Sequence, residues 1–173
     1  MAEPPRLSEI LLPHDKEIIY FVTLCVEGRR SVLANCSTLE AIKKTITHLR
    51  RWQVMAAVIM PDHAHMIIAP VEDRELSVGD FAAGFKRLLR RNLGLQDWEW
   101  QRGCFDRLLR SDEDLGSKWT YVQENPVRAG LVQQSEDWPY YLDFINDGKL
   151  TAFPTETEMD GKLAASPTKA GIP

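Results

Sequence analysis

The sequence has no long hydrophobic run and few cysteines. No stretch of its 173 residues approaches the roughly 18 consecutive apolar residues of a membrane span, and residues 1–10 lack a basic and then apolar leader pattern. The three cysteines are odd in number and lack C-x-x-C spacing, which argues against a disulfide framework or a zinc ribbon. We therefore expect a cytoplasmic protein without membrane association, whose thiols stay reduced.

The chain also lacks an overall excess of positive charge, since its net charge is −4. The charge is uneven, however. Residues 86–110 contain seven basic and three acidic side chains, whereas residues 136–173 contain three basic and seven acidic ones. A basic central segment is compatible with local binding to a nucleic acid, and equally with a solvated helix face.

The order of the expected elements indicates an α+β fold. Strands rich in β-branched and aromatic residues are expected over 18–26, 54–60, 63–69 and 104–109. Helices are expected to be capped by Ser37, Ser77 and Ser111, each of which has an acidic residue three positions later. The order β-α-β-β-α-β-α predicts a ferredoxin-like split βαβ antiparallel sheet, with both internal helices on one face and the last helix against the other.

The composition changes near both ends of the chain. Residues 1–17 mix prolines with charges and are expected to form a lead-in, while residues 146–173 are polar, acidic and without periodicity, as in a flexible tail. Between them, residues 18–145 are long enough to bury a core of their own. We therefore expect one folded domain over 18–145.

Two histidines stand at the start of the third expected strand. His63 and His65 follow a turn at Pro61 and Asp62, and side chains two positions apart on a strand point to the same face. Their imidazoles can aim at one point, as a metal site or a phosphate clamp requires, while Ala64 points to the opposite face. The alternative is two unrelated polar residues at the start of a strand, since short patterns recur by chance.

The last expected helix carries a tyrosine beside its apolar stripe. The stripe runs over 115–122, and Tyr121 lies off it, with Asn125 one turn further on. A tyrosine on a polar helix face is either an ordinary surface residue or a functional group. Asn125 precedes a proline, so its alternative role is to cap a new helical turn that begins at Pro126.

Both motifs resemble those of one enzyme superfamily. Residues 60–65, Met-Pro-Asp-His-Ala-His, resemble the HUH signature of the single-strand insertion-sequence transposases, and residues 121–132 are similar to the tyrosine-helix signature of that superfamily. The branch that the chain most resembles is the transposases associated with repetitive extragenic palindromes (REP), which act on short DNA hairpins. The resemblance covers residues 20–141. Asp62 stands where the family usually has Asn, and Ala64 is smaller than the usual Val, but neither change removes a metal ligand.

The resemblance implies a metal-dependent endonuclease and strand transferase that acts on single-stranded or hairpin DNA. It makes Tyr121 the nucleophile that forms a 5′-phosphotyrosine, and it makes His63, His65 and Asn125 the ligands of Mg²⁺ or Mn²⁺. A tyrosine hydroxyl ordinarily titrates at about pH 10, so it needs activation, for which the metal and Lys118 are candidates. The protein would work as a monomer or a homodimer. The alternatives are a hairpin-binding protein that cuts little and a metallohydrolase that does not use the tyrosine.

Basic side chains are the candidate DNA contacts. They are expected to follow the phosphate backbone, which makes binding sensitive to salt. The candidates are Arg29, Arg30, Lys86, Arg87, Arg90, Arg91 and Arg128. Trp98 and Trp100 are expected to pack in the core, with stacking on unpaired bases as the alternative.

Overall fold

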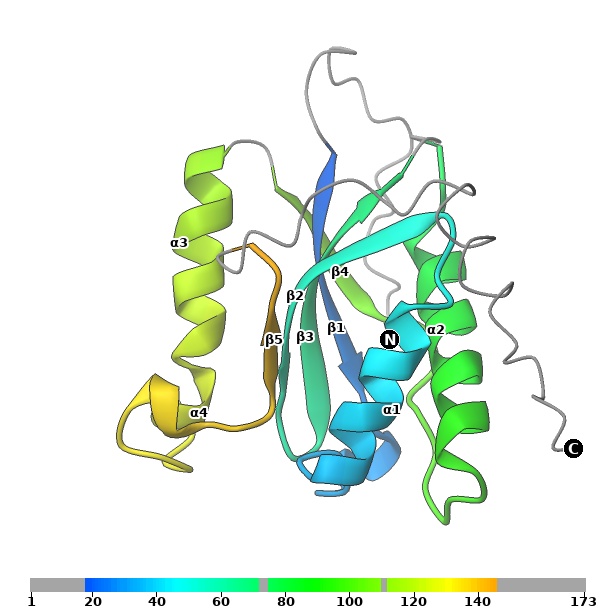
Figure 1. Cartoon of the computed structure of the whole chain (residues 1–173), viewed down its shortest axis with the longest axis horizontal. Helices are drawn as coiled ribbons and strands as arrows, with labels where there is room; N and C mark the ends of the chain where they lie inside the picture. Colours follow the sequence, from blue (N-terminus) through cyan, green and yellow to red (C-terminus); the bar gives the residue numbers. More distant parts are fainter. Residues whose placement is uncertain (1–17, 72–74, 110–111, 146–173) are drawn as a thin grey trace, which may run out of the picture.

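The structure is a computed structural model that describes residues 18–71, 75–109 and 112–145 (Figure 1). The expected lead-in, the expected tail and Ser111 lie outside these residues. The described elements are β1 (Ile19–Cys25), η1 (Glu27–Arg29), α1 (Cys36–Ile46), β2 (Trp52–Ile59), β3 (His63–Pro70), α2 (Val78–Leu93), β4 (Phe105–Leu109), α3 (Asp112–Gln123), α4 (Asn125–Arg128), η2 (Ser135–Asp137) and β5 (Tyr141–Asp143).

The strands form a single antiparallel sheet. Their order across the sheet is β4-β1-β3-β2-β5, and the first four strands in this order have the split βαβ arrangement that the sequence predicts. β5 is an addition that was not predicted. It pairs with β2 over only three residues, which is too short a stretch to show an alternating pattern in the sequence.

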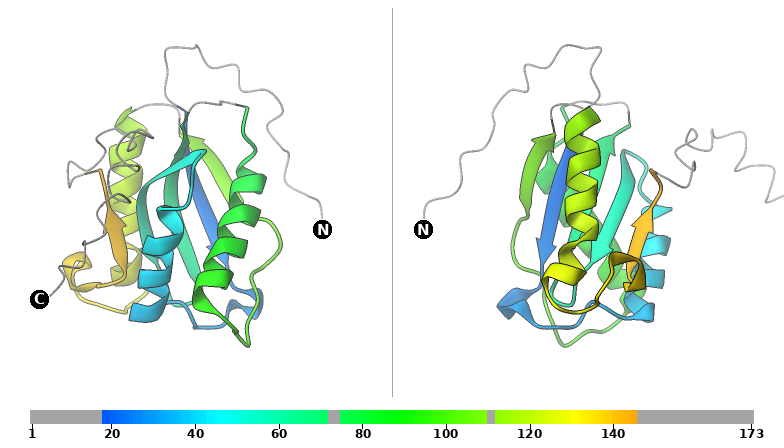
Figure 2. Two further views of the ribbon diagram at one scale, coloured as in Figure 1. Left: turned by 45° about the vertical axis from the view of Figure 1, so that its right-hand side comes forward. Right: turned by 90° about the vertical axis from the view of Figure 1, so that its left-hand side faces the viewer.

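The helices lie on both faces of the sheet. Figures 1 and 2 show α1 and α2 side by side on one face and α3 alone on the other, as predicted. Right-handed crossovers place α1 and α2 together, because each connects two parallel strands across a third. No helix in the described ranges is long and apolar enough to cross a membrane.

Each face of the sheet has its own hydrophobic core, and β3 contributes to both. Met66 and Ile68 are buried under α1 and α2, whereas Ile67 is buried with Trp119 and Val122 of α3. Because side chains alternate along a strand, residues 63 and 65 share the face of Ile67. The histidine pair therefore lies on the α3 side of the sheet, as predicted.

The helix starts differ in part from the prediction. α1 is capped by Asn35, whose side chain accepts a hydrogen bond from the Thr38 N–H at 2.9 Å. The prediction that Ser37 caps this helix is wrong, because α1 begins at Cys36 and Ser37 therefore lies inside its first turn. Ser77 does precede α2, but its side chain makes no capping hydrogen bond. The cap predicted at Ser111 lies outside the described residues.

Candidate active site

The turn between β2 and β3 is fixed by backbone hydrogen bonds to the loop after β1. The Pro61 carbonyl accepts from the N–H groups of Val32 and Leu33, both at 2.8 Å, and the Asp62 carbonyl accepts from the Val26 N–H at 2.9 Å. The residues that donate these three hydrogen bonds are far from the turn in the sequence. The strand that carries the histidines therefore starts at a fixed position.

The two imidazoles face each other across a short gap. Their Nε2 atoms are 3.1 Å apart, and the ring planes are nearly perpendicular at 81°. On the far side of each ring, His63 Nδ1 donates to the Asp62 carboxylate at 2.6 Å, and His65 Nδ1 lies 2.9 Å from the Thr23 hydroxyl oxygen. Each Nδ1 atom thus has a hydrogen-bond partner in the protein, while the two Nε2 atoms point toward each other. This arrangement is usual for histidines that bind metal.

The partners of the two rings also decide where the hydrogens lie. A neutral His63 that donates from Nδ1 presents a lone pair at Nε2, so His65 donates from Nε2 to it and accepts at Nδ1 from the Thr23 hydroxyl. A hydroxyl can equally accept a hydrogen bond. Thr23 therefore stays bonded if His65 moves its proton to Nδ1, and both Nε2 lone pairs then become available to a ligand.

His65 is held in its neutral form. Its ring stacks on Phe21, with the ring centroids 5.2 Å apart and an angle of 27° between the planes. Burial, followed by the nearby groups of His63, Lys118 and Arg29, lowers the pKa of His65 from 6.5 to about 3. The imidazole is therefore uncharged at neutral pH, which is the state that binds metal ions.

Tyr121 lies on α3 and is 45% exposed. The Lys118 ammonium lies 4.8 Å from the centroid of the tyrosine ring, and the Arg128 guanidinium carbon lies 4.3 Å from it. The same ammonium is 4.2 Å from the centroid of Phe21, on which His65 stacks. Contacts therefore run without a break from His65 through Phe21 and Lys118 to Tyr121, and the structure brings the two sequence motifs together.

Asn125 lies at the break between α3 and α4. Its side-chain N–H donates to the Val122 carbonyl at 3.2 Å, so the amide closes the end of α3 and does not cap the start of α4. No hydrogen bond joins Asn125 to either histidine within the described residues. Those residues also contain no group of three His, Cys, Asp or Glu side chains placed to hold a metal.

Two of the candidate DNA contacts lie at this site, and a third lies nearby in sequence. Arg29 forms an ion pair with Asp62 at 2.7 Å, next to the histidine pair, and Arg128 covers the tyrosine ring. Arg30 instead donates to the backbone carbonyl of Asp97 at 2.6 Å and to its carboxylate at 2.9 Å. Arg29 and Arg128 are therefore the members of the set whose positions fit contact with a bound phosphate.

The four candidates on α2 lie on the opposite face of the sheet (Figure 1). Arg87 and Arg91 are exposed. Lys86 and Arg90 are half-buried and donate to backbone carbonyls in the segment 98–103, at 2.8 and 3.1 Å, and burial lowers the pKa of Lys86. Lys86 and Arg90 thus hold that segment against α2. Contact between these four side chains and DNA stays a prediction.

The two candidate stacking residues belong to the hydrophobic core. Trp98 is 5% exposed, and its ring meets that of Trp100 edge to face, with the centroids 5.2 Å apart. Both pack into the core beneath α1 and α2. The core packing expected for both tryptophans is confirmed, and the ring of Trp98 is covered by the protein.

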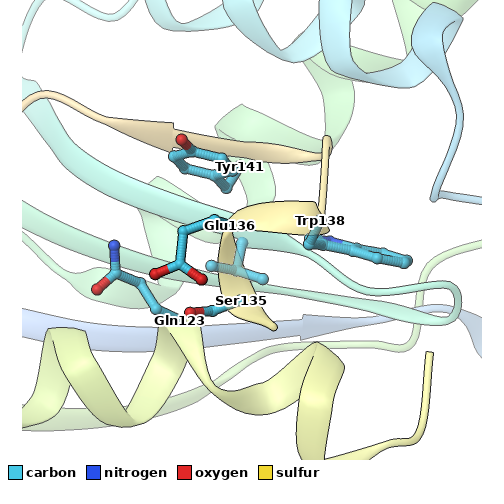
Figure 3. A pocket seen from close by; sticks show the side chains of 6 residues that line it. Gln123, Ser135, Glu136, Trp138 and Tyr141 are labelled. Atoms are coloured by element: carbon cyan, nitrogen blue, oxygen red, sulfur yellow. The ribbon is translucent and has the colours of Figure 1, made fainter. Parts of the chain in front are cut away.

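A small pocket lies on the other flank of α3, between that helix, η2 and β5. Figure 3 shows the side chains that line it: Val58, Gln123, Ser135, Glu136, Trp138 and Tyr141. Its volume of about 80 Å³ is far below the roughly 300–1,000 Å³ of small-molecule sites. The residues that line the pocket include neither histidine nor Tyr121.

Sequence reasoning missed three residues of the site, namely Thr23, Phe21 and Asp62. Asp62 could have been found, since it adjoins His63 and a carboxylate is a common partner of a metal-binding histidine. Thr23 and Phe21 lie on β1, and only the register of β1 against β3 shows that Thr23 pairs with His65. A threonine inside an otherwise apolar strand was the available signal.

Comparison with known proteins finds relatives of one kind. A Haemophilus influenzae protein named as a REP-associated tyrosine transposase is 29% identical over 153 residues, which cover 80% of this chain and 86% of that protein. The REP-associated tyrosine transposase of Escherichia coli K12 is 26% identical over 140 residues, covering 78% and 81%. The solved structure of a REP-associated tyrosine transposase bound to a REP hairpin matches with a TM-score of 0.60 and 28% identity, over 78% of this chain and 82% of that one. No protein-family model matches the chain.

Proposed function

We propose that this chain is a REP-associated tyrosine transposase and that it cuts and rejoins single-stranded DNA next to a hairpin through a covalent link to Tyr121. The observation that carries the proposal is the pair of facing histidine Nε2 atoms, connected to Tyr121 by Phe21 and Lys118. The hairpin is proposed as substrate because the related enzyme of known structure is bound to a REP hairpin.

The histidine pair fits a divalent metal ion. Neighbouring ligands of an octahedral ion with bonds of about 2.1 Å lie about 3.0 Å apart, close to the 3.1 Å between the two Nε2 atoms. The proposed third ligand is the amide oxygen of Asn125. Two imidazoles and one amide suit Mn²⁺ or Mg²⁺, which keep open positions for water and phosphate oxygen. Such an ion supplies Lewis-acid chemistry, which offsets the negative charge that develops on the scissile phosphate.

Tyr121 performs the proposed covalent step. Its hydroxyl oxygen attacks the phosphorus, a bond forms between that oxygen and the 5′-phosphate, and the bond from phosphorus to the 3′-oxygen breaks. The proton that the phenol loses is balanced by the proton that the departing 3′-oxygen gains. The number of phosphate ester bonds is unchanged, so the reverse reaction rejoins a strand without an external energy source.

Two cations assist the tyrosine in this proposal. Lys118 and Arg128 lie over the ring of Tyr121 and fix its position, and both charges lie where a phosphate bound at the tyrosine would gain from them. Arg29 offers a third charge on the histidine side, although Asp62 balances part of it. The local excess of positive charge favours a phosphate diester over a neutral substrate.

The proposal is tested by denaturing electrophoresis of the purified protein with an end-labelled hairpin oligonucleotide that has single-stranded flanks. The oligonucleotide comes from the genomic neighbourhood of the coding sequence, and the reaction is run with Mn²⁺ or with a chelator. We expect a covalent protein–DNA band that needs Mn²⁺ and is absent in Tyr121→Phe. Tyr141→Phe is the matched control, since Tyr141 is 42% exposed on β5 and takes no part in the proposed site.

The same gel separates the alternatives. Cleavage that persists in Tyr121→Phe, without a covalent band, would indicate a metallohydrolase that uses the histidines and water. Binding of the hairpin without any cleavage would indicate a hairpin-binding protein. A covalent band of equal strength with and without the chelator would refute the metal site but leave the tyrosine in place.

A further inference from the structure

One row of side chains crosses the sheet through the histidine site. His65 of β3 pairs with Thr23 of β1, and Thr23 pairs on its other side with Phe105 of the edge strand β4. Residues directly opposite each other in an antiparallel sheet point to the same face. With strands about 4.8 Å apart, Phe105 lies roughly 10 Å from His65 on the same surface.

Phe105 is exposed although it is a large aromatic residue. Its side chain is 64% accessible, and Arg107, two positions further along β4 on the same face, is also exposed. Figure 2 (right) shows why, since α3 stands in front of the middle of the sheet and leaves β1 and β4 beside it. We call this surface, formed by Phe21, Thr23, Phe105 and Arg107, the β1–β4 platform.

Two cations border the platform among the described side chains. Arg107 pairs in register with Phe21, and Lys118 lies over the ring of Phe21, so both cations border the same surface. Neither forms an ion pair within the part of the chain that the structure describes. Asp106 points away, because its partner Val22 is buried beneath the helices on the other face. The platform therefore combines an exposed aromatic ring with unneutralised positive charge.

We propose that the β1–β4 platform binds an unpaired nucleotide of the DNA strand that is cut, with its base stacked on Phe105 and its phosphate near Arg107. The inference rests on the proposed function and extends it to the path of the strand. An exposed ring beside cations is the arrangement by which proteins hold single-stranded nucleic acid, because the ring stacks on the base and the cations neutralise the backbone. The platform continues directly into the histidine site, so a strand on it leads to the scissile phosphate.

The test measures binding in the Tyr121→Phe background, where no covalent product forms. The probes are the hairpin with a single-stranded flank and the same hairpin without the flank. Phe105→Ala is expected to weaken binding of the flanked probe by about 5- to 150-fold, the range for loss of one stacked base, and to leave binding of the bare hairpin unchanged. Phe105→Trp is expected to retain the affinity, because it keeps the stacking surface.

Two further measurements locate the contact. A fluorescent 2-aminopurine placed at successive flank positions is expected to be quenched at one position, and the quenching is expected to disappear in Phe105→Ala. Arg107→Gln is expected to lower the slope of log affinity against log salt by about 0.7, the value for one phosphate contact on a single strand. Leu95→Ala is the control, since Leu95 is fully exposed in the loop after α2 and lies outside the platform.

The outcomes separate this inference from the proposed function. Equal affinity of Phe105→Ala and its parent for the flanked probe would overturn the inference and leave the chemistry at Tyr121 intact. A variant that loses self-association but keeps flank binding would show that the platform contacts a second copy of the chain, which also overturns it. Failure of the unmodified protein to bind either probe would overturn both proposals.

Discussion

The low pKa of His65 makes the stability of the metal-free protein depend on pH. The unfolded chain binds a proton at this side chain when the pH falls through about 6.5, whereas the folded protein does so only near a pKa of about 3. Between pH 6.5 and pH 3 the unfolded state carries a proton on His65 that the folded state lacks, and this proton stabilises the unfolded state relative to the folded one. Folding stability is therefore complete above about pH 7 and is lost progressively as the pH falls.

The size of the loss follows from the two pKa values. Between pH 8 and pH 5 the linkage relation gives a decrease of about 2 kcal/mol in the free energy of unfolding from His65 alone. That is a large share of the roughly 5–15 kcal/mol of a typical domain. A non-titrating residue at the same position cannot contribute this decrease, so His65→Gln is expected to lose about 2 kcal/mol less than the wild type over this interval.

Urea unfolding followed by tryptophan fluorescence measures the effect, with a chelator present at both pH values. His48→Gln is the matched control for replacing a histidine by glutamine, because His48 is exposed in the turn after α1 and lies outside the histidine pair. The reasoning is refuted if the His65→Gln protein loses as much stability between pH 8 and pH 5 as the wild type does.

Three other predictions follow from contacts around the site. Lys118→Gln is expected to raise the pKa of His65, observed by NMR titration, because the ammonium group helps to lower it. Trp138→Phe is expected to lower the free energy of unfolding by about 1–3 kcal/mol, measured in urea, since it leaves the buried carbonyl of Ile59 without its 3.1 Å hydrogen bond. Asp62→Ala is expected to weaken Mn²⁺ binding by about 10- to 100-fold in calorimetry, as for other outer partners of metal-binding histidines.

The sequence was sufficient to predict the sheet, its first four strands and the face on which the histidines lie. Those predictions rest on periodicity, which is a local property. Strand alternation puts His63 and His65 on one face and Ala64 on the other, and right-handed crossovers put the first two helices together on one face.

What the sequence could not predict depends on contacts between distant segments. The role of Thr23 follows from the register of β1 against β3, and β5 owes its position to pairing with β2. The basic residues of α2 show the same limit. Lys86 and Arg90 have the composition of a DNA-binding face, but the segment that follows their helix folds back and supplies carbonyl partners for both. Composition shows that charge is present, whereas only the fold shows what it contacts.

The distribution of charge reconciles the net negative charge of the protein with the proposed polyanionic substrate. Four elements that are distant in the sequence bring one cation each to the neighbourhood of the histidines, in the form of Arg29, Lys118, Arg128 and Arg107. Only Arg29 is neutralised there by a carboxylate, that of Asp62, within the described residues. Because attraction between exposed charges fades over about 8 Å at physiological salt, DNA near this face responds to these cations and hardly to the net charge of −4. We therefore expect this local positive charge to guide the proposed DNA strand toward the face that carries Tyr121.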